Sequence, residues 1–258
     1  MSDSHGQFIW YDLVTPDPDG AVKFYTSLIG WGTQVWNAPE PYTMWENKGT
    51  PLGGVVKAGS GMGDYPHWLP YVAVDDVDKT ASLATSLGAK ITSGPKDIPG
   101  SGRYAILQDP QGASIAIFKS SSTAQVPAFN PGSGNMSWHE LTTDDYNAAF
   151  EFYNKIFGWN RNGEFDMGPM GIYQMYGKGD TMYGGMMNKP PDMKMPSNWV
   201  SYIMIDDVNK VIEHAKQLGA KLMHGPAEVP GGDWIAIFTD PQGAVFAVHQ
   251  KGKSQDAK

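Results

Sequence analysis

The chain contains the same hairpin sequence twice. The stretches at residues 106–118 and 237–249 read ILQDPQGASIAIF and IFTDPQGAVFAVH, with DPQGA between two apolar segments. The second copy follows the first by 131 residues, from Asp109 to Asp240. Self-similarity over such a distance is the signature of duplicated structural units. It constrains the fold more than any local propensity, because each half must build its own copy of one structure.

Other short motifs recur together with this hairpin. Phe24-Tyr25 and Gly30-Trp31 return as Phe152-Tyr153 and Gly158-Trp159, Tyr42 returns as Tyr173, Gly53-Gly54 as Gly184-Gly185, and Asp75-Asp76-Val77 as Asp206-Asp207-Val208. The offset is 128 residues for the early motifs and 131 for the later ones, so one loop of the second half is longer. We predict two homologous domains at residues 1–119 and 135–258, joined by a Ser/Pro/Gly-rich linker at 120–134.

Each half divides again into two units with the order β-α-β-β-β. In the first half we expect strands at 7–14, 42–46, 52–57, 68–74, 103–108 and 113–119, and helices at 17–28 and 77–87. Gly30 and Gly88 stand just beyond the two helices, where a left-handed residue commonly ends a helix. The pattern predicts an α+β fold built from four related modules.

These motifs resemble the vicinal oxygen chelate superfamily, which includes glyoxalases, bleomycin-resistance proteins and extradiol dioxygenases. The resemblance rests on the FY…GW helix ends, the DDV…LGAK helix and the DP-x-G hairpin, each present twice. It implies two tandem domains, each of two βαβββ modules that curl a mixed β-sheet into a cup around a ligand. The motifs are specific for the fold and say little about the reaction.

Composition excludes several classes of function. The net charge of −8 divides evenly between the halves, and no basic patch stands out, so we expect no nucleic-acid partner. The absence of cysteine excludes disulfides, thiolate metal sites and cysteine nucleophiles. No stretch resembles a signal peptide or a membrane span. We expect a cytoplasmic monomer or homodimer whose partner is a small molecule, with no membrane association.

Strand parity predicts which side chains face the cup. If residues 109–112 form a four-residue loop, Gln108 pairs with Ala113, and cross-strand partners share a face. This register directs Arg103, Ala105, Leu107, Ser114, Ala116 and Phe118 into the first cup, and Trp234, Ala236, Phe238, Val245, Ala247 and His249 into the second. A slip of one residue would invert the assignment.

The resemblance also implies where a metal would bind. Metal-dependent relatives carry His or Gln on the first strand of a module and Glu on the last. The matching positions here are Trp10, Trp138, Leu69, Val200, Ala116, Ala247 and the small residues near 53–55 and 184–186. Divalent ions need carboxylate, imidazole or amide donors. We therefore expect no metal and no other cofactor, and a site formed by His139, Glu140 and His249 would need a bulge.

Polar candidates remain on the expected cup faces. Asp12 and Glu140 lie two residues after Trp10 and Trp138, so each shares a face with its tryptophan. A carboxylate on such a wall needs a partner or a shifted pKa. It would serve as a structural hydrogen-bond acceptor, a general base or a ligand anchor. His249 is a candidate acid/base neighbour of Glu140, or a histidine with satisfied structural bonds.

The remaining candidates are a cation and a set of aromatic residues. Arg103 would pair with Asp12 or hold an anionic ligand. The predicted lining consists of Trp10, Tyr71, Phe118, Trp138, Tyr202 and Trp234, although core packing would also explain these residues. The second half holds 11 of the 14 methionines. Methionine-rich surfaces adapt to varied apolar partners, although a loosely packed loop would have the same composition.

The functional hypothesis is a glyoxalase-like protein that binds a small aromatic or hydrophobic molecule in a metal-free cup. Binding would serve sequestration or metal-independent chemistry. The alternative is a lyase, isomerase or hydrolase that uses Asp12 or Glu140 as acid/base. A metal-dependent glyoxalase or dioxygenase is disfavoured. Whether the protein is an enzyme stays open, and we expect the two cups to differ.

Overall fold

The computed structural model describes residues 4–37, 41–59, 62–122, 129, 131–190 and 194–252. Of the predicted linker, residues 123–128 and 130 lie outside the described residues. Among the described residues, no helix has the length and apolar character needed to cross a membrane.

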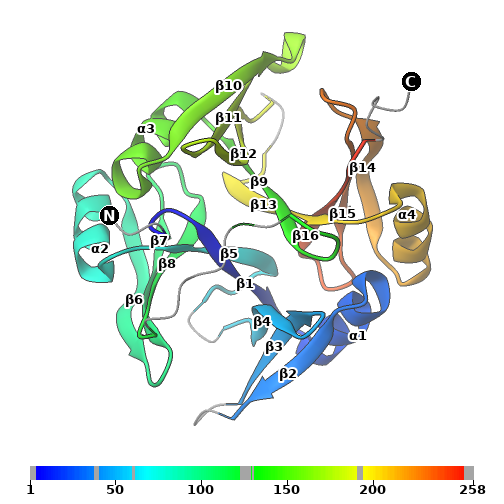
Figure 1. Ribbon diagram of the computed structural model, residues 1–258, viewed down its shortest axis with the longest axis horizontal. Coiled ribbons are helices and arrows are strands. Elements are labelled where there is room, and N and C mark those ends of the chain that lie inside the picture. Colours follow the sequence, from blue (N-terminus) through cyan, green and yellow to red (C-terminus); the bar gives the residue numbers. More distant parts are fainter. Residues whose placement is uncertain are drawn as a thin grey trace. The chain divides into compact units, whose positions relative to one another are not determined.

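Each half of the chain forms two β-α-β-β-β modules (Figure 1). The first half contains β1 (Phe8–Thr15), α1 (Pro18–Ile29), β2 (Gly32–Trp36), β3 (Tyr42–Asn47), β4 (Thr50–Lys57), β5 (His67–Ala73), α2 (Val77–Ser86), β6 (Lys90–Ile98), β7 (Gly102–Gln108) and β8 (Ser114–Ser120). The second half contains β9 (Met136–Thr143), α3 (Tyr146–Phe157), β10 (Asn160–Asp166), the short 3-10 helix η1 (Gly168–Met170), β11 (Ile172–Lys178), β12 (Thr181–Asn188), β13 (Asn198–Met204), α4 (Val208–Gln217), β14 (Lys221–Glu228), β15 (Trp234–Thr239) and β16 (Val245–Gln250).

The strands form two mixed, open eight-stranded sheets. Their orders are β2-β3-β4-β1-β5-β8-β7-β6 and β10-β11-β12-β9-β13-β16-β15-β14. Within each sheet the pair β1/β4, or its counterpart β9/β12, is parallel, whereas the hairpins β3/β4 and β11/β12 are antiparallel. The predicted α+β class with two tandem domains is confirmed.

The first helix of each half begins after an aspartate and ends at a glycine, and the helix predicted at 17–28 lies at Pro18–Ile29. The Asp17 side chain accepts a hydrogen bond from the Gly20 backbone N–H at the start of α1, and Asp145 caps α3 in the same way. Gly30 ends α1 with φ 83°, and Gly158 ends α3 with φ 72°. Glycine adopts this left-handed conformation without the strain that a Cβ would cause.

The strands β2 and β6 were not located from the sequence. Both lie at an edge of the first sheet, and their side chains are mostly exposed or half-buried. The strand β6 reads KITSGPKDI, in which a glycine and a proline interrupt the alternating pattern, and its pairing with β7 shifts at two bulges. An edge strand has a neighbouring strand on one side only, so its side chains are less covered and its sequence shows a weaker hydrophobic pattern.

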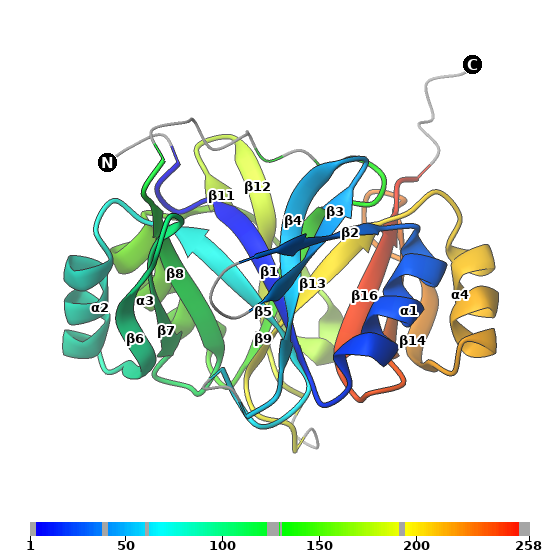
Figure 2. The same ribbon diagram turned by 90° about the horizontal axis from the view of Figure 1, so that it is seen from below.

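Compact packing divides the chain into two units that cross the sequence repeat. The first unit comprises residues 1–10, 69–129 and 139–199, and the second comprises 11–68, 130–138 and 200–258. In the first unit α2 lies along β6 and β7, and in the second α4 lies along β14 and β15 (Figures 1 and 2). Each unit thus takes one module from each half, and the predicted domain boundaries stay predictions.

An aromatic cluster fills the core of each unit. In the second unit, the Tyr25 ring packs against Trp31, Trp45 and Trp68. The corresponding cluster of the first unit consists of Tyr153, Phe157, Trp159, Tyr176 and Trp199. Large aromatic side chains bury much apolar surface in few residues, which suits a module with one short helix.

The predicted register of the DPQGA hairpins was wrong by one residue. Gln108 pairs with Ser114, which makes the loop five residues long, from Asp109 to Ala113. The reason is the Asp109 carboxylate, because its Oδ1 accepts the backbone N–H groups of Gln111 and Ala113 and so stabilises the wider loop. The face assignment is therefore inverted for β7 and β15.

Candidate ligand-binding face

A tyrosine–carboxylate pair lies on the first module of each half. In the second unit, Tyr42 Oη donates a hydrogen bond to Asp12 Oδ1. In the first unit, Tyr173 Oη donates to Glu140 Oε2 at 2.9 Å. In both cases the carboxylate comes from the strand that begins the module, and the tyrosine comes from the strand two places away in the sheet.

A glycine on the strand between them makes each pair possible. Gly54 is the cross-strand partner of Asp12, and Gly185 is the partner of Glu140. A Cβ on Gly54 would lie 2.0 Å from the Tyr42 hydroxyl, and one on Gly185 would lie 2.1 Å from the Tyr173 ring. The tyrosine therefore lies flat across the glycine to reach the carboxylate. This explains the second glycine of each repeated Gly-Gly motif.

The first glycine of each motif serves the opposite side of the sheet. A Cβ on Gly53 would lie 2.0 Å from the Tyr11 carbonyl oxygen, and one on Gly184 would lie 1.8 Å from the His139 carbonyl oxygen. Glycine is required where backbones approach this closely. The two adjacent glycines therefore satisfy two different steric demands.

Apolar side chains surround each pair on the same face. Cross-strand partners share a face, so strand pairing places further residues beside each pair, including Gln34 in the first repeat and Thr142 in the second. Three apolar residues of each face are used below. In the first repeat these are Trp36, Met44 and Val56, and in the second they are Phe165, Met175 and Met187. The residues are half-buried or exposed. We call the two sets, each with its tyrosine, glycine and carboxylate, the Asp12 face and the Glu140 face.

The two carboxylates differ in access to solvent. Asp12 is 3% exposed, whereas Glu140 is half-buried. Glutamate is one methylene longer than aspartate, so its carboxyl group extends further from the strand. The same tyrosine–glycine arrangement therefore holds a buried aspartate in one repeat and a partly exposed glutamate in the other.

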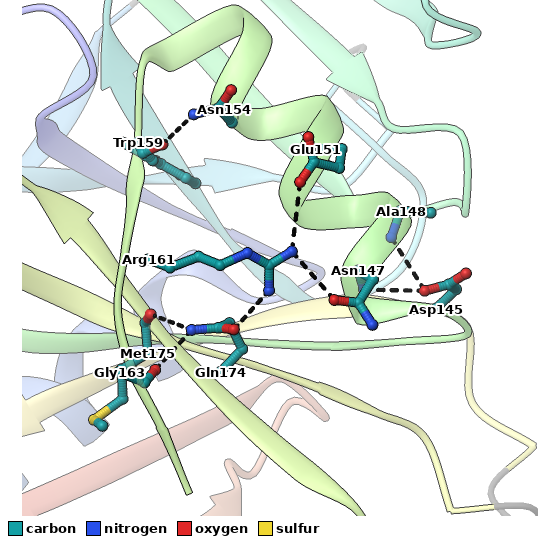
Figure 3. A network of polar contacts seen from close by, with 10 residues as sticks. All are labelled: Asp145, Asn147, Ala148, Glu151, Asn154, Trp159, Arg161, Gly163, Gln174 and Met175. Carbon is teal, nitrogen blue, oxygen red and sulfur yellow. Dashed lines mark hydrogen bonds and ion pairs between the residues drawn. The ribbon is translucent and has the colours of Figure 1, made fainter.

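Additional polar contacts hold the strand that carries Tyr173 (Figure 3). Gln174 is 2% exposed; its Oε1 accepts a bond from Arg161 at 2.6 Å, and its Nε2 donates to the Gly163 carbonyl oxygen at 2.6 Å. The Arg161 guanidinium also donates to Asn147 on α3. Thr33 and Thr43 occupy the matching positions of the first repeat.

The positions that the resemblance assigns to a metal form an apolar cluster in the second unit. Trp138 packs against Val200 and Ala247, together with Tyr202. None of these side chains provides a carboxylate, imidazole or amide donor, so the donor set does not fit a divalent cation. Across the part of the chain that the structure describes, no three His, Cys, Asp or Glu side chains gather as a metal site requires, and this includes His139, Glu140 and His249.

His139 has a structural environment. Its ring stacks on Phe8 with centroids 3.7 Å apart, and its Nδ1 lies 2.9 Å from the Tyr183 carbonyl oxygen. The side chain is fully buried, and burial lowers the pKa of His139 to about 3. The imidazole is therefore neutral at physiological pH.

His249 lies in a polar cluster that the sequence analysis did not predict. Its Nε2 is 2.7 Å from Asp233 Oδ2, and its Nδ1 is 3.0 Å from the Ser137 hydroxyl. Burial lowers the pKa of His249, although the Asp233 carboxylate acts in the opposite direction. The first repeat carries Ile9, Gly102 and Phe118 at the three matching positions. All three polar residues of the cluster are thus replaced in the first repeat, and an alignment of the two halves shows this difference.

Arg103 does not reach the predicted face. Its guanidinium donates to Asp78 at 2.7 and 2.8 Å and to Asp97 at 2.9 Å, and these bonds raise its pKa. Asp78 belongs to α2, so the corrected register directs Arg103 toward the helix. The same one-residue difference applies in the second half, where Ile235 pairs with His249. Trp234 therefore lies on the face opposite to the predicted one.

Apart from Trp234, the aromatic residues of the predicted lining lie on the strand faces that the sequence predicted. Tyr71 pairs with Ala116, and Phe118 pairs with Ala73, so all four share a face of β5 and β8. Tyr202 pairs with Ala247 in the second half. Tyr71 and Tyr202 are buried, whereas Trp10, Phe118 and Trp138 are half-buried. A ligand-binding role for these residues stays a prediction.

Sequence reasoning missed the tyrosines and glycines of the two faces. Tyr42 and Tyr173 were recognised only as markers of the repeat, as were Gly54 and Gly185. The signal was present, because both residue types recur at the same spacing from a carboxylate. Its meaning depends on which strands lie side by side.

The fold and its faces define a class of protein: a duplicated βαβββ chain with a tyrosine–carboxylate pair on the first module of each half. The chain belongs to the Glyoxalase/Bleomycin resistance protein/Dioxygenase superfamily, which it matches over residues 7–117 and 135–248.

Relatives of similar length support this membership. The chain is 31% identical over 253 residues to "Putative glyoxylase CFP32" of Mycobacterium tuberculosis (strain CDC 1551 / Oshkosh), covering 95% of both chains. It is 30% identical over 257 residues to the anthracycline biosynthesis protein DnrV of Streptomyces peucetius, covering 93% of this chain and 91% of the relative. The 2,3-dioxygenase LapB from Pseudomonas sp. KL28 shares the fold, with a TM-score of 0.66, 11% identity and coverage of 97% and 94%.

Proposed function

We propose that the protein binds a small aromatic or hydrophobic organic molecule without a metal ion. The observation that carries the proposal is the tyrosine–carboxylate pair set among apolar side chains, which occurs in both repeats. Sites for small organic molecules combine an apolar lining with a few fixed polar groups. The pair would fix the orientation of the ligand, and the aromatic residue and methionine would contact its apolar part.

The proposal of a metal-independent site rests on donor chemistry. The positions assigned to a metal by family resemblance carry Trp138, Val200 and Ala247, which pack together. A ligand would be held by hydrogen bonding and apolar contact instead. A relative named for anthracycline biosynthesis is compatible with a role in the chemistry of organic natural products.

Calorimetric titration with 1-naphthalenemethanol tests the proposal. This probe combines an aromatic ring system with one hydroxyl group, so it matches the two features of the faces. We expect saturable binding that persists after dialysis against EDTA. Binding that disappears on chelation and returns with a divalent ion would reject a metal-independent site. Absence of binding at millimolar probe would reject the proposed ligand class.

A second candidate function is metal-independent acid/base catalysis by Glu140. The partial exposure of Glu140 favours it, because a general base must reach the proton that it removes. Replacement of Glu140 with Gln would then lower turnover by roughly 10²- to 10⁴-fold while ligand affinity changes little. If the protein only binds its ligand, the same substitution would alter affinity alone.

A further inference from the structure

We infer that the Glu140 face is the one that binds the ligand, and that the ligand presents a hydrogen-bond donor, a hydroxyl group or a protonated amine, to it. The inference rests on the proposed function. It adds which of the two repeats binds the ligand and what kind of polar group the ligand carries. Four features of the two faces carry it.

Access is the first feature. Asp12 is 3% exposed and accepts the Tyr42 hydroxyl, whereas Glu140 is half-buried with Tyr173 at 2.9 Å. A carboxylate sealed in this way stabilises the fold, and a ligand would have to displace its surroundings to reach it. Glu140, with the longer side chain, stays partly exposed.

Rigidity is the second feature. Gln174 follows Tyr173 directly and is held by Arg161 on one side and by the Gly163 carbonyl oxygen on the other (Figure 3). Arg161 also lies over the Phe150 ring of α3, 4.2 Å from its centroid. The matching Thr33 and Thr43 of the first repeat are too short to form such a link. A binding group fixed in advance loses less entropy when the ligand binds.

Charge is the third feature. The Tyr173 hydroxyl donates a hydrogen bond to Glu140, and a carboxylate can accept more than one such bond, so the polar group of this face is a hydrogen-bond acceptor. Glu140 carries the only charge among the six residues of its face. Arg103, for which pairing with Asp12 and binding of an anion were both considered, forms hydrogen bonds with Asp78 and Asp97. A donor would be attracted to this face and an anion repelled.

The apolar surroundings are the fourth feature. Met187 stands in the second repeat where the first has Val56, so the Glu140 face carries two methionines. Phe165 is 43% exposed beside them. Methionine side chains are flexible and polarizable, so they fit planar apolar molecules of varied outline. The face therefore suits an aromatic ring system that carries one donor group.

Three probes that share one ring system test the charge class. They are 1-naphthylmethylamine, 1-naphthalenemethanol and 1-naphthoate, which are cationic, neutral and anionic at pH 7. We expect the amine to bind most tightly and the carboxylate at least about ten-fold more weakly, the order that an anionic acceptor requires. Equal or tighter binding of 1-naphthoate would overturn the inference and leave the proposed function intact. Failure of all three to bind would overturn both.

Matched variants test which repeat is used. The Glu140→Gln substitution should weaken amine binding by about 10- to 100-fold, the effect of losing a charge-assisted hydrogen bond. Asp12→Asn should weaken it by a smaller factor. Glu213→Gln removes one exposed negative charge from α4 and controls for net charge. A larger effect of Asp12→Asn than of Glu140→Gln would overturn the assignment to the second repeat.

A further variant separates direct contact from loss of folding. Tyr173→Phe removes the hydroxyl group while keeping the ring over Gly185. It should weaken amine binding less than Glu140→Gln does and leave the circular dichroism spectrum unchanged. If Glu140→Gln lowers affinity only together with a loss of native spectrum, the contact role is overturned.

Discussion

The phenol of Tyr25 donates a hydrogen bond to the carboxylate of Asp240, 3.0 Å away and 215 residues later in the chain. The matching pair in the first unit is Tyr153 and Asp109, at 2.8 Å. Each tyrosine comes from an FY motif of one half, and each aspartate comes from the DP-x-G hairpin of the other. The two motifs that identify the repeat are thus physical partners.

A buried network surrounds each of these bonds. The Trp68 indole donates to the Tyr25 hydroxyl, as Trp199 does to Tyr153. Burial raises the pKa of the Asp240 carboxyl, whereas bonds from Ala244, Tyr25 and Gln242 lower it. A buried carboxylate that loses a donor is strongly penalised.

Tyr25→Phe should therefore lower the free energy of unfolding by about 1–3 kcal/mol, since it leaves a buried acceptor with one bond fewer. Urea denaturation measures this change. Tyr65→Phe is the control, because Tyr65 is 56% exposed. A Tyr25→Phe variant as stable as the control would show that the bond contributes nothing to the fold.

Acid should destabilise the protein through His139. Its pKa is about 3 in the folded chain and about 6.5 when exposed to water, so the unfolded state takes up a proton first as the pH falls. The stabilisation is complete above pH 6.5 and is lost progressively from there toward pH 3. Between pH 7 and pH 5 this residue should lower the free energy of unfolding by about 1–2 kcal/mol.

Urea denaturation at several pH values checks the contribution of His139. The His139→Gln variant should show a shallower loss of stability on acidification, whereas exposed His224→Gln should behave like the wild type. His5 and His249 also have pKa values lowered by burial and will retain part of the slope. An unchanged slope in His139→Gln would contradict the prediction.

Gly185→Ala should displace the Tyr173 ring from Glu140. The new Cβ would lie 2.1 Å from ring atoms of the tyrosine, so one of the two must move. Overpacking of this kind destabilises proteins by about 1–3 kcal/mol. The loss should shrink in a Tyr173→Ala background, which removes the clash. Additive effects of the two substitutions would refute the steric argument.

Arg103→Gln should leave the affinity for 1-naphthoate unchanged. The guanidinium lies on Asp78 and Asp97, so its removal takes no charge from either carboxylate-bearing face. Calorimetry on the wild type and the variant makes the comparison. Weaker binding of the anion in the variant would contradict this expectation and favour the alternative in which Arg103 holds an anionic ligand.

The purified protein should contain no stoichiometric divalent metal. The reason is the donor set, since Trp138, Val200 and Ala247 occupy the positions assigned to a metal. Elemental analysis of protein expressed in metal-supplemented medium measures the content. About one Zn, Mn, Fe or Ni per domain, together with lower stability after chelation, would count against this expectation.

The sequence alone determined the repeat, the order of elements and most helix ends. These features are local or periodic: an aspartate caps a helix by bonding to residues two or three places ahead, and a glycine ends one through its own φ. Counting along the strands also gives the positions that the family resemblance assigns to a metal. Three of them, Trp138, Val200 and Ala247, pack together in the structure.

Only the tertiary structure decided which residues meet across strands. The sequence predicts a four-residue DPQGA loop, whereas the observed loop has five residues. The Asp109 side chain stabilises the longer loop by accepting hydrogen bonds from two backbone N–H groups. Side chains alternate between the two faces of a strand, so this difference of one residue places each β7 side chain on the face opposite to the predicted one. Arg103 therefore lies on the side of the helix. The pairing of Tyr173 with Glu140 across Gly185, and of Tyr25 with Asp240, depends likewise on strand order and module packing, which no local pattern specifies.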